Sequence, residues 1–155
     1  ADIYKDAREL AKLGDHVIIQ IPLVEDAVSA IRRLSAEGVK VGATLVFNAA
    51  QAILAAKAGA SMVATALDQL DAYGHDGLDV VSQLHAVFAD GRFECDVMAL
   101  HPRDATQFAG CAVAGADVVA LPPQLVRTLL LHPLTDRGLD QFLNELARGH
   151  RGRSS

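Results

Sequence analysis

Residues 58–64 read Ala-Gly-Ala-Ser-Met-Val-Ala, and residues 114–120 read Ala-Gly-Ala-Asp-Val-Val-Ala. Each stretch begins where an Ala-rich, helix-like segment ends, and each runs into an apolar, β-branched segment. Glycine is favoured just after a helix, because the residue there adopts a left-handed conformation that a Cβ atom disfavours. The near repeat therefore indicates a recurring unit of helix, glycine and buried strand.

The same unit extends in both directions along the chain. Apolar residues at helical spacing predict helices over residues 2–13, 25–37, 49–58, 77–89, 104–114, 123–131 and about 136–148. Apolar runs predict strands over residues 16–22, 39–47, 61–67, 93–100 and 117–121. Short apolar strands joined through helices form a parallel sheet covered by helices, so the class is α/β. Periodicity alone leaves open whether this sheet is open and doubly wound or closed into a barrel.

Composition argues against several classes of function. A length of 155 residues suits one domain, residues 1–155, and with 51% hydrophobic and only 5% aromatic residues its core should be aliphatic. The net charge of −5 argues against nucleic-acid binding, which needs a basic face.

Charges interrupt every apolar run before membrane-spanning length and no leader is apparent, so we expect a cytoplasmic protein without a membrane partner. We also expect no metal, because no ligand spacing is evident, and no cofactor. Cys95 and Cys111 are expected to be reduced core thiols.

Four segments, in order and in one register from about residue 5 to 148, carry a family resemblance. They are residues 17–22 (Val-Ile-Ile-Gln-Ile-Pro), 42–51 (Gly-Ala-Thr-Leu-Val-Phe-Asn-Ala-Ala-Gln), 64–74 (Ala-Thr-Ala-Leu-Asp-Gln-Leu-Asp-Ala-Tyr-Gly) and 114–122 (Ala-Gly-Ala-Asp-Val-Val-Ala-Leu-Pro). Together they resemble the transaldolase and fructose-6-phosphate aldolase family, whose members act on sugar phosphates. The resemblance implies a parallel (β/α)8 TIM barrel, of which this chain would hold the fourth to eighth strands and a C-terminal helix.

The resemblance also locates the chemistry of the family. Its Schiff-base lysine falls at Gln20, whose amide nitrogen cannot form an imine because the lone pair is delocalised. Ala66 stands where the aldolases have an inward tyrosine, and Gln69 stands where the family has an arginine that holds the substrate phosphate. None of the lysines is expected at the C-terminal ends of the strands, where barrel enzymes place their active sites; they are Lys5, Lys12, Lys40 and Lys57. The catalytic residue is therefore unassigned.

Six residues are candidates for substrate binding at those strand ends: Gln20, Thr44, Asp68, Gln69, His101 and Arg103. Thr44 matches an inward threonine of the family, and a strand threonine that bonds a neighbour is the structural alternative. His101 falls near a family serine, and Arg103 near a basic residue where a helix N-terminus would add donors for an anion. Structural roles stay open for these too: a turn for Asp68, a backbone-capped loop for His101 and an exposed helix start for Arg103. His75 and His85 are expected on the surface, away from the site.

Three hypotheses of function follow. The first is a family member that has lost Schiff-base chemistry and persists as a sugar- or sugar-phosphate-binding or partner subunit. The second is an active transaldolase or aldolase in which Gln20 replaces the lysine of the native protein. The third is a different acid–base chemistry on the same scaffold, using His101 or Asp68. The first leads, because the residues that the family chemistry needs are replaced.

Five strands of a barrel leave two open edges, at residues 16–22 and 117–121. We expect the inward side chains of Ile18, Val46 and Val119 to meet water there. The chain should therefore form a homo-oligomer or bind a companion chain that supplies the first barrel strands. The resemblance implies that the last helix, residues 136–148, contacts a neighbouring subunit.

Overall fold

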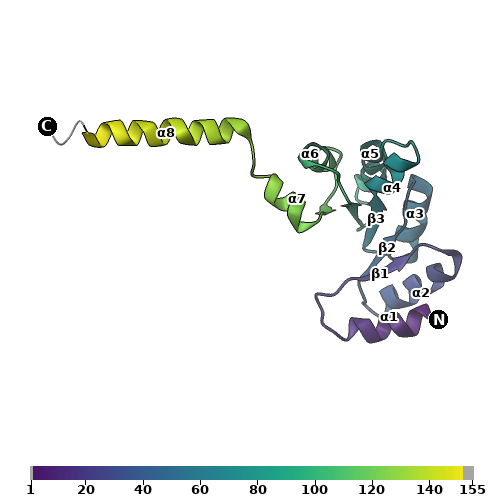
Figure 1. Ribbon diagram of the computed structural model, residues 1–155. Coiled ribbons are helices and arrows are strands. Elements are labelled where there is room, and N and C mark those ends of the chain that lie inside the picture. The colour runs from purple at the N-terminus through teal and green to yellow at the C-terminus, as the bar shows by residue number, and fades with distance from the viewer. Residues whose placement is uncertain (1, 152–155) are drawn as a thin grey trace. The chain divides into compact units, whose positions relative to one another are not determined.

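The computed structural model describes residues 2–151 (Figure 1). Contacts divide the chain into two compact units, Ala1–Leu121 and Pro122–Ser155, and each is described by itself. The prediction of a single domain stays a prediction.

The first unit is built on a parallel sheet of five strands in the order β1-β2-β3-β4-β5. They are β1 (Ile19–Pro22), β2 (Val41–Thr44), β3 (Met62–Ala66), β4 (Asp96–Leu100) and β5 (Val118–Ala120). Strand order follows chain order throughout, as in a TIM barrel, whereas a doubly wound sheet reverses its order at a switch point. The fold is therefore α/β with the topology of part of a TIM barrel, and β1 and β5 are its edges, as expected.

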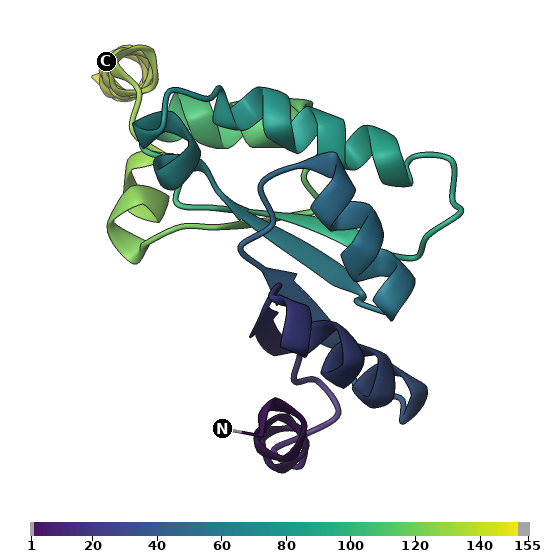
Figure 2. The same cartoon turned by 90° about the vertical axis from the view of Figure 1, so that its right-hand side faces the viewer.

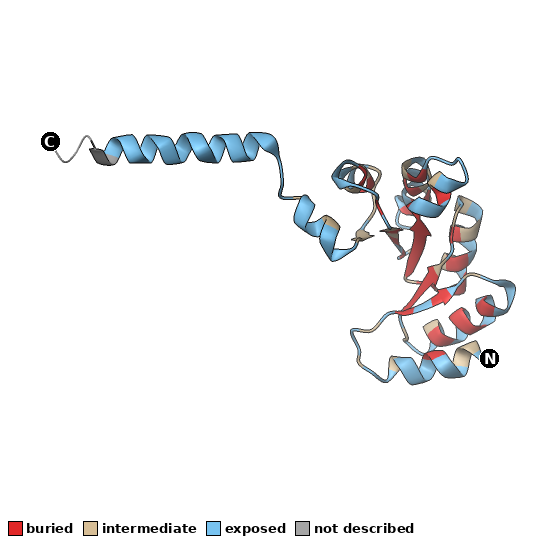
Figure 3. Ribbon diagram, viewed as in Figure 1, coloured by how far each residue is buried: buried red, intermediate tan, exposed pale blue. Residues whose placement is uncertain are grey.

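Helices of the first unit pack along the sheet and bury an aliphatic core (Figures 2 and 3). They are α1 (Ile3–Ala11), α2 (Glu25–Ala36), α3 (Ala49–Ala58), α4 (Leu67–Ala72), α5 (Gly77–Phe88) and α6 (Ala105–Val113). Side chains alternate along β1, so Ile19 and Ile21 are buried against the helices while Gln20 points to the opposite, exposed face. Cys95 and Cys111 are buried and free, which agrees with the expectation of core thiols.

Predicted element boundaries were most accurate where capping residues mark both ends. Helix α3 spans residues 49–58 as predicted, because the side chain of Asn48 caps its start and Gly59, at φ 101°, ends it. The strand predicted over residues 39–47 is shorter, because β2 ends at Thr44 and Leu45 turns the chain with φ 58°. Helix α4 was not predicted, since Leu67 was assigned to the preceding strand and the other five residues were interpreted as a loop.

The expectation for the inward side chains was partly wrong. Ile18 is exposed, but Val46 is fully buried, because the turn at Leu45 ends the alternation of β2 before Val46 is reached. Val119 pairs with Ala99 and packs partly buried against the helix-side core.

The second unit contains α7 (Pro123–Thr128) and α8 (Pro133–Arg151). Large apolar side chains on α8 are exposed, among them Leu139, Phe142 and Leu143. Within the described residues, no helix has both the length and the apolar character to cross a membrane.

Candidate functional site

The C-terminal ends of the five strands, here called the mouth, bring together two candidates that are 33 residues apart in sequence. Strands β3 and β4 are neighbours in register, with Ala66 beside Leu100. The residues that follow them are therefore adjacent, and His101 Nδ1 lies 3.2 Å from Asp68 Oδ1. His101 has φ 57°, an uncommon conformation for a residue with a Cβ atom. A carboxylate on Nδ1 favours the tautomer whose proton lies on that nitrogen, which leaves Nε2 as an acceptor.

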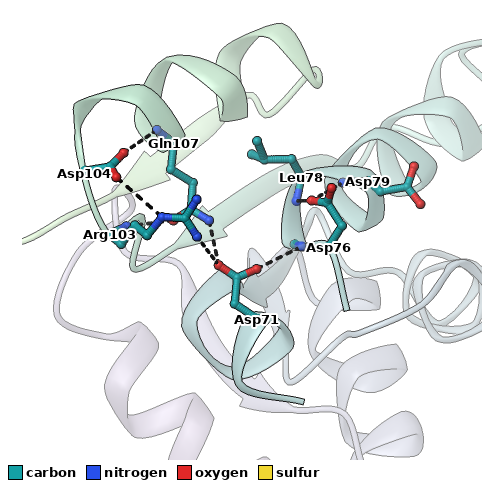
Figure 4. A network of polar contacts seen from close by, with 8 residues as sticks. Asp71, Asp76, Leu78, Asp79, Arg103, Asp104 and Gln107 are labelled. Carbon is teal, nitrogen blue, oxygen red and sulfur yellow. Dashed lines mark hydrogen bonds and ion pairs between the residues drawn. The ribbon is translucent and has the colours of Figure 1, made fainter. Parts of the chain in front are cut away.

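Arg103, a predicted anion ligand, is held by carboxylates (Figure 4). Its Nη1 lies 3.0 Å from Asp71 Oδ2, and its Nε lies 3.5 Å from Asp104 Oδ2. Asp71 also accepts hydrogen bonds from Gln107 Nε2 at 2.8 Å and from the Gly77 backbone N–H at 3.2 Å. The Asp71 carboxylate thus joins α4 to the first turns of α5 and α6, and the charge of Arg103 is largely compensated.

The loops that precede α6 and α3 are each held by a pair of reciprocal hydrogen bonds between side chains and backbone N–H groups. Asp104 Oδ1 accepts from the Gln107 backbone N–H at 2.7 Å, and Gln107 Oε1 accepts from the Arg103 N–H at 2.8 Å. At the start of α3, Asn48 Oδ1 accepts from the Gln51 N–H at 2.9 Å, and Gln51 Oε1 accepts from the Phe47 N–H at 2.8 Å. These reciprocal bonds resemble a capping box and satisfy N–H groups that a helix start leaves without partners.

Gln20 and Thr44 lie on neighbouring strands, apart from this network. Gln20 is exposed on β1 beside Gly42, and Thr44 is the last residue of β2. Across residues 2–151, no hydrogen bond or ion pair joins either side chain to the Asp68–His101 pair. The structure therefore brings Asp68 and His101 together, but it shows no direct link from them to Gln20.

The lysines lie away from the mouth. Lys5 and Lys12 pair with Asp2 and Glu9 along α1, at 3.9 and 2.6 Å. Lys57 is in the last turn of α3, where its Nζ lies 5.5 Å from the Phe93 ring centroid. Lys40 immediately precedes β2, at the N-terminal end of the sheet. Within residues 2–151, the lysines therefore stand on or beside helices, or at the opposite end of the sheet.

Gln69 lines a cavity of about 490 Å³ whose other lining residues were not predicted. They are Phe47, Asn48, Leu70, Tyr73 and His75. His75 is exposed, as expected, and it lines this cavity together with Gln69, because the chain beyond helix α4 returns to the cavity. Recognising residues 67–72 as a short helix that ends at Tyr73-Gly74 could have placed His75 beside the cavity. Across residues 2–151, no cluster of three or more side chains suited to a metal ion is present.

Comparison with known proteins agrees with this geometry. The family model for transaldolase/fructose-6-phosphate aldolase matches residues 1–151. Proteins described as probable transaldolases include one from Petrotoga mobilis, 40% identical over 91% of this chain and 64% of the relative. Another, from Kosmotoga olearia, is 40% identical over 96% of this chain and 68% of the relative. The chain thus spans about two thirds of the length of these relatives, and it belongs to the transaldolase/fructose-6-phosphate aldolase family.

Proposed function

We propose that this family member has lost Schiff-base chemistry and acts as a binding or partner subunit that holds a sugar or sugar phosphate at the mouth. The observation that carries the proposal is Gln20, which stands at the position that the resemblance assigns to the Schiff-base lysine. Imine formation needs a neutral amine that attacks the ketone carbon, and an amide nitrogen has no available lone pair. The lysines are on helices or at the opposite end of the sheet, so none substitutes for it.

The polar groups that line the mouth support a binding role. Gln69, Asn48 and Tyr73 offer hydrogen-bond donors and acceptors around a cavity large enough for a hexose. The capped loop before α3 holds Phe47 and Asn48 of that lining in place. Binding of a sugar at this cavity therefore needs no Schiff-base lysine.

The proposal is tested by measuring binding and cleavage on the same sample. Fructose 6-phosphate or fructose is titrated while ligand-observed NMR follows binding, and released triose or triose phosphate is assayed over hours. We expect binding without release of product. Steady release of a triose would contradict the proposal and support the hypothesis of an active aldolase.

A second candidate function rests on the contact between Asp68 and His101. An imidazole whose Nδ1 faces a carboxylate can move a proton through Nε2, which suits acid–base chemistry on a sugar. This candidate predicts exchange of a carbon-bound proton of the ketose with solvent deuterium. The exchange should be abolished by His101→Gln, whereas pure binding leaves the proton in place.

We also propose that copies of the chain associate through α8, whose exposed face carries Leu139, Phe142 and Leu143. Burying these side chains would contribute about 25 cal/mol per Å² of apolar surface. A companion chain of different sequence is the alternative partner.

A further inference from the structure

The cavity beside Gln69 is lined by aromatic, amide, aliphatic and imidazole side chains. Phe47 and Tyr73 provide aromatic rings, Asn48 and Gln69 provide amides, and Leu70 and His75 complete the lining. No carboxylate, guanidinium or ammonium group is among the lining residues. A phosphate ester bound here would find no guanidinium or ammonium group in the lining to compensate its charge.

Several polar groups of the lining have no partner within residues 2–151. No hydrogen bond involves the side chains of Gln69 or His75, or the hydroxyl of Tyr73, which is 87% exposed. Asn48 uses Oδ1 to cap α3, and its amide N–H groups make no bond among the described residues. Amides pair well with vicinal hydroxyl groups, because they offer a donor and an acceptor side by side. An aromatic ring favours the C–H face of a sugar.

The charged side chains that follow β3 and β4 are paired with one another. Asp68 precedes Gln69 on α4, and its carboxylate contacts the imidazole of His101. The guanidinium of Arg103 is already paired with Asp71 and Asp104. The guanidinium of this network is therefore engaged by carboxylates and is not among the groups that line the cavity.

We propose that this cavity binds an unphosphorylated, polyhydroxylated ligand, such as a neutral ketose or polyol, in preference to its phosphate ester. This inference rests on the proposed function and names its ligand class. Gln69 is the residue that determines specificity, because it places a neutral amide where a cation would be needed to hold a phosphate. Tyr73 and Asn48 contact the neutral ligand.

Calorimetric titrations with fructose and with fructose 6-phosphate test the preference on the full chain. We expect fructose to bind at least about threefold more tightly than its phosphate ester. The variant Gln69→Arg should reverse the order and raise the affinity for the ester about tenfold, near the lower end of what one charge-assisted bond contributes. Gln83→Arg is the matched control, because it adds the same charge on the exposed face of α5 and should leave both affinities unchanged.

Tyr73→Ala should weaken fructose about tenfold and should leave the melting temperature near that of the unmodified protein, since this side chain is 87% exposed. Tighter binding of the phosphate ester, or no binding of fructose, would overturn the ligand assignment. The proposed function fails differently: a borohydride-stabilised adduct on a lysine would refute the loss of Schiff-base chemistry whichever ligand bound more tightly.

Discussion

Removing the Asp71 carboxylate should destabilise the first unit far more than removing an exposed carboxylate of similar sequence context. In Asp71→Ala, the amide of Gln107, whose residue is only 4% exposed, loses its acceptor at 2.8 Å. A buried donor left unpaired costs about 1–3 kcal/mol. The ion pair with Arg103 adds about 0–1 kcal/mol, because the Arg103 side chain is 68% exposed.

The expected loss for Asp71→Ala is therefore about 1–4 kcal/mol in the free energy of unfolding. With a urea m-value of about 2 kcal/mol per M, the unfolding midpoint should fall by about 0.5–2 M, as followed by circular dichroism. Asp79→Ala is the matched control, because Asp79 bonds the exposed Gln83 and occupies the first turn of α5. It should cost no more than about 1 kcal/mol. Equal losses for the two variants would refute the role given to Asp71 in joining α4, α5 and α6.

Three further predictions concern other parts of the chain. Gly115→Ala should lower the melting temperature more than Gly91→Ala in differential scanning calorimetry. Both glycines have positive φ, but only at position 115 would an added Cβ atom meet the ring of His85. Equal shifts of the melting temperature would contradict this. Burial, with Asp96 and Asp117 nearby, raises the pKa of Cys95 to about 12. At pH 8 the thiolate fraction is then about one in ten thousand, so a disulfide reagent should label Cys95 only after unfolding. Rapid labelling of Cys95 in the native protein would contradict this. Phe142→Asp should lower the mass measured by light scattering towards that of one 16.4 kDa chain if α8 mediates association, whereas an unchanged oligomer would place the contact elsewhere.

Sequence reasoning identified elements well where local chemistry defines them. Asn48 and Gly59 mark both ends of α3, and the apolar spacing over residues 77–89 predicted α5, whose Val81, Leu84 and Phe88 are buried. The end of β2 was overextended, because Leu45 and Val46 continue the apolar run while the backbone turns at Leu45. A turn made by a non-glycine residue leaves no compositional signal.

The candidate site was predictable only in part. The family resemblance placed Gln20, Thr44, Asp68, Gln69, His101 and Arg103, and four of these follow strand ends at the mouth. The contact between Asp68 and His101 depends on the register of β3 against β4, and this register could not be predicted from the sequence. The pairing of Arg103 with Asp71 also depends on α4, the helix interpreted as a loop. Contacts of this kind arise from tertiary packing, and they decide whether a cation is available to a ligand.

Borohydride trapping tests the central claim, the loss of the Schiff-base amine at Gln20, most directly. The chain is incubated with dihydroxyacetone, reduced, and analysed intact and after proteolysis by mass spectrometry. Reduction of an imine would add the mass of the ketone less one oxygen atom, since water leaves and a hydride and a proton are gained. Our account predicts an unchanged mass and unmodified peptides around Lys5, Lys12, Lys40 and Lys57. A stoichiometric adduct on any of these lysines would contradict it.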